Sequence, residues 1–316
     1  MELEIISENL PATLTIIVLT VVVIEWIRLT LTGKIENQKE SWVNIFSAGL
    51  AFLPQFLITK AVFLVIMFWA YHNRFFDTGF EWYYWIIAWV IYDFSFWLIH
   101  FLGHKVRLLW CLHSVHHSAK EMKLSVGFRG SLFDVLIVPH TFLWLPLLGF
   151  NPFLVLIVDA VAKLYGVAVH INEDLVPNKK RRWFERIVIT PSAHRVHHST
   201  NHAYLDTNYG ETLVIWDRMF NTYQVELDEE TPRYGVMKEV ASGNLYDTQF
   251  NEFIGLWKDI KSTKSIINKL KYLFMPPGWS HKGETISAKK LREEALLEIQ
   301  KRRTYNNVYN SLQLNS

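Results

Sequence analysis

The sequence predicts an all-α membrane protein: a multi-pass bundle of about four to five spanning helices with a histidine-rich cap for two metals on its cytoplasmic face. Half of the 316 residues are hydrophobic, and the chain holds 13 Trp and 13 Tyr, whose rings favour the bilayer interface. Several apolar runs are long enough to cross a bilayer. Eight of the 13 histidines fall into three short clusters, which predicts the metal site.

Five apolar runs are candidates for spanning helices, because each approaches or exceeds the length that crosses a bilayer. They are Leu10 to Leu31, Trp42 to Tyr71, Trp82 to Leu102, Leu132 to Phe150 and Pro152 to Ile171. The first follows an acidic start, unlike the basic start of a secretory signal, so we expect an uncleaved helix. Pro54 should kink the second run, and Lys60 should face protein or a cavity. The last two runs should form a helical hairpin.

The order of these runs predicts which side of the membrane each part faces. If the hairpin crosses outward and returns, both HxxHH clusters lie on one side and the N-terminus lies on the other. The loops on the cluster side hold most lysines and arginines, including the Lys179 to Arg182 run, whereas the opposite side holds little more than Arg74. The positive-inside rule then places the clusters on the cytoplasmic face.

The histidine clusters share a helical spacing. They are His100 and His104 (HxxxH), His113, His116 and His117 (HxxHH), and His194, His197 and His198 (HxxHH). Residues at i, i+3 and i+4 share one face of a helix, so each cluster can present its rings to a common point. Imidazole suits Fe, Cu, Zn and Ni. One HxxHH alone could be structural, but eight imidazoles in repeated motifs indicate metal binding and are more than one metal needs.

The rest of the composition excludes other classes of site. A net charge of +2 gives no indication of nucleic-acid binding. The one cysteine, Cys111, excludes an intramolecular disulfide and a cysteine-based metal site.

We expect three parts along the chain: residues 1–81 with the N-terminal spanning helices, residues 82–223 with the clusters and further spans, and residues 224–316 as a cytoplasmic C-terminal region. From Asp206 onward the chain is soluble in character. Residues 288–303 should form an exposed, charged helix with one apolar side for packing or for a membrane surface. That side holds Leu291, Ala295, Leu296 and Ile299. The final segment, Thr304 to Ser316, should be loose.

The three histidine motifs resemble those of the fatty acid hydroxylase/sterol desaturase superfamily, which are integral-membrane di-iron oxygenases. Further typical segments follow the third cluster, namely Asp206-Thr-Asn-Tyr-Gly210, Ile215-Trp-Asp-Arg218 and Phe220. The Pro-Pro-Gly-Trp at residues 276–279 is similar to the bacterial branch related to alkylglycerol monooxygenase. The resemblance covers roughly Tyr84 to Trp279, and it is more specific for the superfamily than for a substrate.

The resemblance implies a set of iron ligands. These would be His100, His104, His113, His116, His117, His194, His197 and His198, with His170 as the additional ligand that the family supplies before its third cluster. No catalytic residue beyond the ligands is expected.

Six further residues are candidates for supporting the ligands. Glu173 and His202 are weaker candidates for ligands or for residues that contact them, and Asn208 and Asp217 match family positions that orient ligands or brace the loop. Asp93 and Asp159 could accept the second N–H of a metal-bound imidazole, which such rings usually donate. Asp93 and Asp159 fit equally well as paired structural residues.

The resemblance implies an O2-dependent lipid hydroxylase or desaturase with two iron ions as its cofactor. The substrate would be a membrane lipid such as a sterol, a fatty acyl chain or a glyceryl ether lipid. No segment for haem, flavin or an iron–sulfur cluster is seen in the sequence. The electrons would therefore come from a separate redox protein or from a tetrahydropterin.

Two other functions remain open at the level of the sequence. A zinc-dependent membrane hydrolase would need an open coordination position and a base, for which Glu173 or Glu211 could serve. A non-enzymatic metal transporter or sensor would place its ligands along a path through the membrane, whereas most of these histidines are expected at one surface.

Overall fold

The computed structural model describes residues 2–58, 62–176, 183–283, 285 and 287–314. The predictions for Lys60 and for the Lys179 to Arg182 run fall outside these residues. Within the described ranges every regular element is a helix, and paired extended chain is limited to two isolated bridges, Val188 with Leu213 and Ser199 with Tyr234. The all-α prediction is therefore confirmed.

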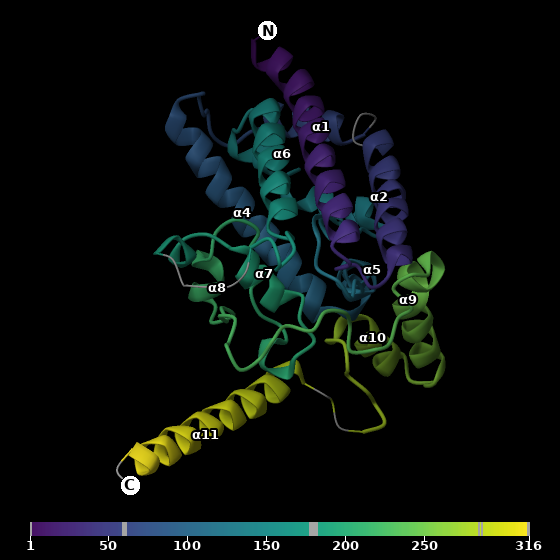
Figure 1. Cartoon of the computed structure of the whole chain (residues 1–316). Coiled ribbons are helices and arrows are strands. Elements are labelled where there is room, and N and C mark those ends of the chain that lie inside the picture. Colours follow the sequence, from purple (N-terminus) through teal and green to yellow (C-terminus); the bar gives the residue numbers. More distant parts are fainter. Residues whose placement is uncertain (1, 59–61, 177–182, 284, 286, 315–316) are drawn as a thin grey trace.

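An apolar bundle forms one end of the molecule (Figure 1). It contains α1 (Glu2–Leu31), α2 (Gln38–Ile58), α3 (Leu64–His72), α4 (Trp82–Lys105) and α6 (Pro152–Ala168). Two of these helices, α2 and α4, are long and apolar enough to cross a membrane. The predicted total of about four to five spans stays a prediction.

Large apolar side chains lie on both the inside and the outside of this bundle. The shared core of α4 and α6 includes Tyr92, Leu154 and Val158, which are almost fully buried. On the outside, Phe52 and Trp69 remain 66% and 63% exposed. Exposed apolar surface of this kind is typical of a protein that contacts lipid.

The hairpin predicted from Leu132 to Ile171 is only half correct. Its second arm is α6, which Asn151 caps by accepting a hydrogen bond from the amide of Phe153 at 2.9 Å. Its first arm is not one helix but three short 3-10 turns, η3 (Asp134–Leu136), η4 (Val138–Thr141) and η5 (Leu145–Leu148). Pro139 and Pro146 interrupt that arm, because proline lacks the amide hydrogen that an α-helix needs.

The predicted second span, Trp42 to Tyr71, contains most of α2, with Pro54 inside the helix, and most of α3. Residues 59–61, between these two helices, lie outside the described residues.

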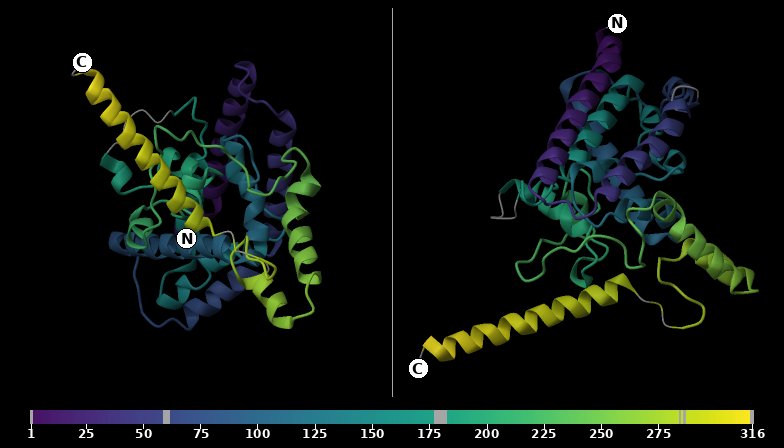
Figure 2. Two further views of the ribbon diagram at one scale, coloured as in Figure 1. Left: turned by 90° about the horizontal axis from the view of Figure 1, so that it is seen from below. Right: turned by 45° about the vertical axis from the view of Figure 1, so that its right-hand side comes forward.

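A cap made of the remaining helices forms the other end (Figures 1 and 2). The cap helices are α5 (Arg107–His117), α7 (Pro191–His197), α8 (Ile215–Met219), α9 (Leu245–Lys261), α10 (Ile266–Phe274) and α11 (Ala288–Leu314); the short turns η2 (Leu124–Phe128), η6 (Trp183–Arg186) and η7 (His202–Tyr204) join them. The division at residues 81 and 223 stays a prediction. Elements across it are in contact, since Gln249 of α9 donates to the hydroxyl of Ser47 in α2 at 3.2 Å.

The C-terminal helix projects from the cap (Figure 2). Its predicted apolar side is confirmed as a packing surface, because Ala295, Leu296 and Ile299 pack against a cluster that includes Val196 and Tyr204. The prediction of a loose segment after Thr304 is wrong as far as residue 314, since α11 continues to Leu314. That segment contains neither Gly nor Pro, so nothing in it stops a helix.

Candidate metal centre

The structure brings nine histidines together in two groups where the bundle meets the cap. The first group contains His100, His104, His113, His117 and His197, and the second contains His116, His170, His194 and His198. Within each group, one ring nitrogen from every member lies within 4.8 Å of the others. The eight histidines of the three motifs and His170 are therefore neighbours in space.

Four elements deliver these rings. The end of α4 carries His100 and His104, α5 carries the first HxxHH motif, and α7 with its C-cap carries the second. The turn after α6 delivers His170. The amide of His170 donates to the carbonyl of Val167 at 3.1 Å, which closes that turn.

The two groups are interlocked. In α5, His113 and His117 face the first group while His116 faces the second, and α7 does the reverse by sending His197 to the first group. The i and i+4 positions of a helix lie almost above each other, whereas i+3 is rotated to one side. Each HxxHH motif thus spans both groups instead of supplying one.

The spacing of the nitrogens fits a metal ion in each group. In the second group, Nε2 of His170 lies 2.9 Å from that of His194 and 3.2 Å from that of His116. In the first group, Nε2 of His113 and His117 are 3.1 Å apart. Nitrogens about 2.1 Å from one ion lie roughly 3.0 to 3.4 Å from each other.

Several of these nitrogens lack any other partner. Nε2 of His100, His104 and His197 is buried and makes no hydrogen bond. A buried polar atom without a partner is costly. Three such atoms that point to one place suit a cation as their common partner, so the residues present fit a metal.

The protein also holds the second ring nitrogen of several of these rings. Nδ1 of His100 donates to the carbonyl of Tyr209 at 2.8 Å, and Nδ1 of His197 donates to the carbonyl of Thr207 at 2.8 Å. Nδ1 of His170 donates to the carbonyl of Gly166 at 2.7 Å. A carbonyl can only accept, so the proton sits on Nδ1 and Nε2 keeps its lone pair for a metal.

Burial keeps the imidazoles neutral. It lowers the pKa of His194, His197 and His198 well below the ordinary value, and it lowers the pKa of His170 to about 4. Neutral imidazole is the form that binds a metal. The same low-dielectric surroundings that disfavour a positive charge on each ring thus prepare the rings as ligands.

Asp206 is a functional candidate that the prediction of site residues missed. Its carboxylate lies 3.5 Å from Nδ1 of His104 and also pairs with Lys105. Burial alone would raise the pKa of Asp206, but the hydrogen bond from His104 and the nearby positive charge lower that pKa to about 2. The sequence contains a signal for it, because Asp206 opens the Asp-Thr-Asn-Tyr-Gly segment that is typical of the superfamily which the motifs resemble.

Arg129 was also missed, and no spacing pattern pointed to it. Its side chain is 1% exposed and donates to the carbonyl of Val115 at 3.0 Å and to the hydroxyl of Ser118 at 2.8 Å. The carbonyl of Arg129 accepts a hydrogen bond from His116. Arg129 therefore fixes the end of α5 and orients one ring of the second group.

Asn208 and Asp217 brace the loop that holds the first group. Asp217 accepts hydrogen bonds from the amides of Tyr209 at 2.9 Å and Gly210 at 2.8 Å. The amide group of Asn208 donates to the carbonyl of Ala193 at 2.9 Å, and its backbone adopts a φ of 57°, which asparagine tolerates well. These contacts fix the carbonyl of Tyr209 that accepts from His100.

The partners of Asp93 and Asp159 given by the structure are not histidines. Asp93 accepts from the amide of Thr212 at 3.0 Å and from the indole of Trp216 at 2.9 Å, so it ties the same loop to α4. Asp159 accepts from Tyr92 at 2.9 Å and pairs with Lys163 at 2.8 Å. Asp159 thus matches the structural alternative.

Glu173 and His202 lie outside both groups. Glu173 forms a side-chain hydrogen bond with Tyr234, and burial raises its pKa. His202 is exposed.

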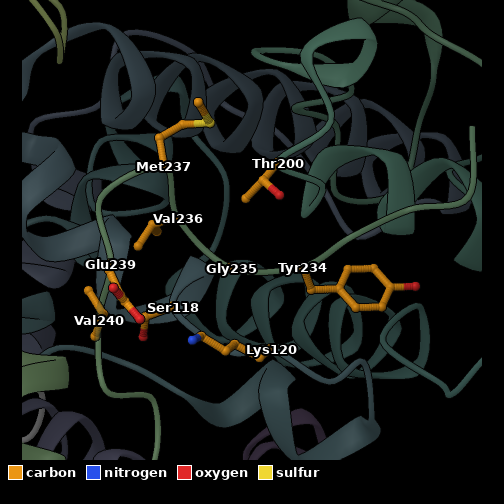
Figure 3. A pocket seen from close by; sticks show the side chains of 9 residues that line it. All are labelled: Ser118, Lys120, Thr200, Tyr234, Gly235, Val236, Met237, Glu239 and Val240. Carbon is orange, nitrogen blue, oxygen red and sulfur yellow. The ribbon is translucent and has the colours of Figure 1, made fainter.

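A polar cavity of about 170 Å³ lies beside the ends of the two HxxHH segments. Ser118 follows His117 directly and Thr200 follows His198 by two residues, and both line it. Lys120 and Glu239 add charge to the lining, while the ring of Tyr234 points away from the other labelled side chains (Figure 3). The cavity therefore gives the cap a polar hollow close to the histidines.

Comparison with known proteins decides the family. Residues 85–222 match the model of the fatty acid hydroxylase family. The chain carries a fatty acid hydroxylase domain. All nine grouped histidines lie inside the matched range of this domain. The resemblance that the motifs indicated is confirmed.

Proteins similar to this chain include two alkylglycerol monooxygenases. That of Homo sapiens is 30% identical over 266 residues, which are 81% of this chain and 56% of the relative. That of Danio rerio is 29% identical over 279 residues, which are 84% of this chain and 57% of the relative. The chain thus spans little more than half the length of these relatives.

A bacterial relative is the ornithine lipid hydroxylase OlsE of Rhizobium tropici. It is 32% identical over 166 residues, which are 51% of this chain and 47% of the relative. No solved structure matches the chain significantly.

Proposed function

We propose that this protein is a membrane-embedded, O2-dependent di-iron hydroxylase of a lipid. The observation that carries the proposal is the pair of interlocked histidine groups at the end of α4, a helix apolar enough to cross a bilayer. A lipid could reach such a site from the bilayer without entering water.

The proposed ligands are the nine grouped histidines, five for one iron and four for the other. Bound iron would supply the activation of O2 for attack on an unactivated C–H bond. In the balanced reaction, O2 accepts two electrons from the substrate C–H bond and two from a donor; one oxygen atom enters the lipid and the other leaves as water. The protein's own part is to hold the Nε2 lone pairs in place through the carbonyls of Thr207, Tyr209 and Gly166.

The names of the relatives support a lipid substrate and hydroxylation in place of desaturation. Both an alkylglycerol monooxygenase and an ornithine lipid hydroxylase are among them. We infer a substrate with an acyl or alkyl chain, such as a fatty acyl, sterol or glyceryl ether lipid. The electron donor would be a separate redox protein or a tetrahydropterin.

The placement in the membrane is part of the proposal. We infer a multi-pass bundle with the histidine groups on the cytoplasmic face, because the loops on that side hold most of the basic residues in the sequence. The exposed apolar outside of α2 and α3 supports lipid contact.

No observation favours the two alternatives. A catalytic zinc site uses about three protein ligands, whereas nine imidazoles gather here, and Glu173, one possible base, lies outside both groups. A transporter would spread its ligands along a path, whereas these lie at one end of the bundle.

Metal analysis and lipid analysis test the proposal together. Protein loaded with iron under anaerobic conditions should hold close to two iron ions per chain, one for each group. Lipids from a wild-type strain should include a species with one more oxygen atom than its precursor in a deletion strain. One zinc ion and no iron in natively purified protein would contradict the proposal, and a loss of two hydrogens instead of a gain of oxygen would name a desaturase.

A further inference from the structure

Two segments far apart in the sequence form one exposed apolar surface beside α4. They are residues 183–187, which include η6, and residues 215–220, which include α8; we call them the shoulder. Its exposed apolar side chains are Trp183 (74%), Ile187 (53%), Ile215 (48%), Met219 (61%) and Phe220 (49%). No element among the described residues covers these side chains, so the shoulder has no partner in that part of the chain.

Backbone hydrogen bonds between residues 187–189 and 212–214 hold the two segments of the shoulder together. The amide of Val214 donates to the carbonyl of Ile187 at 2.9 Å, and the amide of Ile189 donates to the carbonyl of Thr212 at 2.9 Å. An isolated antiparallel bridge joins Val188 and Leu213 between them. The two segments are therefore one surface and not two separate patches.

The shoulder is fixed to the middle of α4 instead of its polar end. The indole of Trp216 donates to the carboxylate of Asp93, and the ring of Phe220 stacks on Trp97 at 4.5 Å. Asp93 lies twelve residues before Lys105, the last residue of α4, so it is about 18 Å along the axis from that end. An element bonded to the middle of a spanning helix lies at the depth of the bilayer.

The backbone of the shoulder suits a medium without water. Irregular chain at membrane depth is tolerated only where its polar groups are satisfied. The amides of Ile187 and Val188 both donate to the carbonyl of Phe184, and the amide of Leu213 donates to Asp93. With the two bonds between the segments, the amides of residues 187–189 and 212–214 all have partners.

The helix α4 itself carries exposed apolar side chains on the N-terminal side of Asp93. Ile86, Ile87 and Val90 are exposed further up this helix. Two exposed arginines, Arg186 and Arg218, stand among the apolar side chains of the shoulder. Arginine buries its stem in apolar surroundings and keeps its charge near lipid phosphate.

We propose that the shoulder is embedded among phospholipid acyl chains of the leaflet next to the cap, without crossing the membrane. The inference rests on the membrane placement proposed above. It also brings lipid close to the candidate site, because Asp217 of α8 holds the amide of Tyr209, whose carbonyl accepts from His100.

A fluorophore on the shoulder tests this. Cys111 is the only cysteine and is 1% exposed, so an environment-sensitive NBD label on Met219→Cys should be selective, with labelling of the unchanged chain as the blank. Met237→Cys is the matched control, because Met237 is 60% exposed and Met219 is 61% exposed. Phe52→Cys on α2 reports the membrane placement itself. All are measured in full-length protein in phosphatidylcholine vesicles.

The label at Met219 should be quenched several-fold more by phospholipid carrying an acyl-chain nitroxide than by aqueous iodide, and the label at Met237 should show the opposite preference. If iodide quenches the label at Met219 while the nitroxide lipid quenches the label at Phe52, the proposal for the shoulder is wrong and the membrane placement still holds. Shielding of Met219 from both quenchers would also overturn it, because a protein partner would then cover the surface. An iodide-sensitive Phe52 would remove the membrane placement and the shoulder with it.

Discussion

His197 and His116 are the two rings that cross between the histidine groups. Each sits at the i+3 position of its HxxHH motif, and each joins the group to which its own helix contributes less. The spacing predicted that each motif would converge on one point. It could not predict the division, because that depends on how α5 and α7 face each other, which is set by packing and not by the motif.

A ligand test follows at this scale. His198→Ala should abolish turnover and lower the retained iron, because it removes a buried imidazole whose Nε2 lies 3.1 Å from that of His194. His202→Ala is the matched control, since His202 lies four residues further on, is exposed and belongs to neither group. Iron per chain would be measured for both proteins after the same purification. Equal iron in the two variants would contradict the proposed ligand set.

Among the elements, the helices that carry histidines were the most predictable. The 3.6-residue repeat and the motif spacing predict α4, α5 and α7. In the structure, Thr190 caps α7 by accepting a hydrogen bond from the amide of Ala193. The run from Leu132 to Phe150 was not predictable as 3-10 turns from apolar length alone. Pro139 and Pro146 were the signal, and continuous hydrophobicity hid it.

The packing of α11 on α7 gives a prediction at the scale of elements. Ile299 is 6% exposed and packs with Val196, which lies between His194 and His197. Ile299→Asp would bury an unpaired charge there and should lower the free energy of unfolding by about 2–4 kcal/mol.

Leu297→Asp changes the same helix at a side chain that is 56% exposed, so it should leave that free energy nearly unchanged. The thermal unfolding of the detergent-solubilised proteins would be compared. Similar melting temperatures for the two variants would show that α11 does not support α7.

On the scale of the whole molecule, composition predicted the apolar bundle and the cap, but it misjudged where the bundle ends. The chain after Asp206 is soluble in overall character, yet Ile215, Met219 and Phe220 are exposed on α8 or directly after it. Those few apolar residues lie among charged ones, so an average over the segment conceals them. The hydrogen bonds to Asp93 and the stacking of Phe220 on Trp97 show that this part returns to the side of α4.

The stability of the whole metal-free protein should depend on pH. Burial lowers the pKa of the imidazoles in α5, in α7 with its C-cap, and at His170. Below the ordinary pKa of 6.5 the unfolded chain therefore binds more protons than the folded chain, and stability falls as the pH falls. For His170, stability is lost as the pH falls from 6.5 to about 4, the folded-state pKa.

Thermal unfolding of metal-free protein at a series of pH values would check this. The melting temperature should fall as the pH falls from 7 to 5 by more than in the His198→Ala protein, which has one buried imidazole fewer. A melting temperature that rises toward pH 5 would contradict the assignment of neutral buried rings.

The sharing of α5 and α7 between the two groups also bears on how the protein acquires its metals. Under the proposed ligand set, whichever ion arrives first orders both helices, and both helices carry ligands of the other ion. The second ion then meets a site whose conformational entropy has already been lost. Loading would be cooperative, so that half-filled molecules are rare and the chain passes from empty to complete in nearly one step.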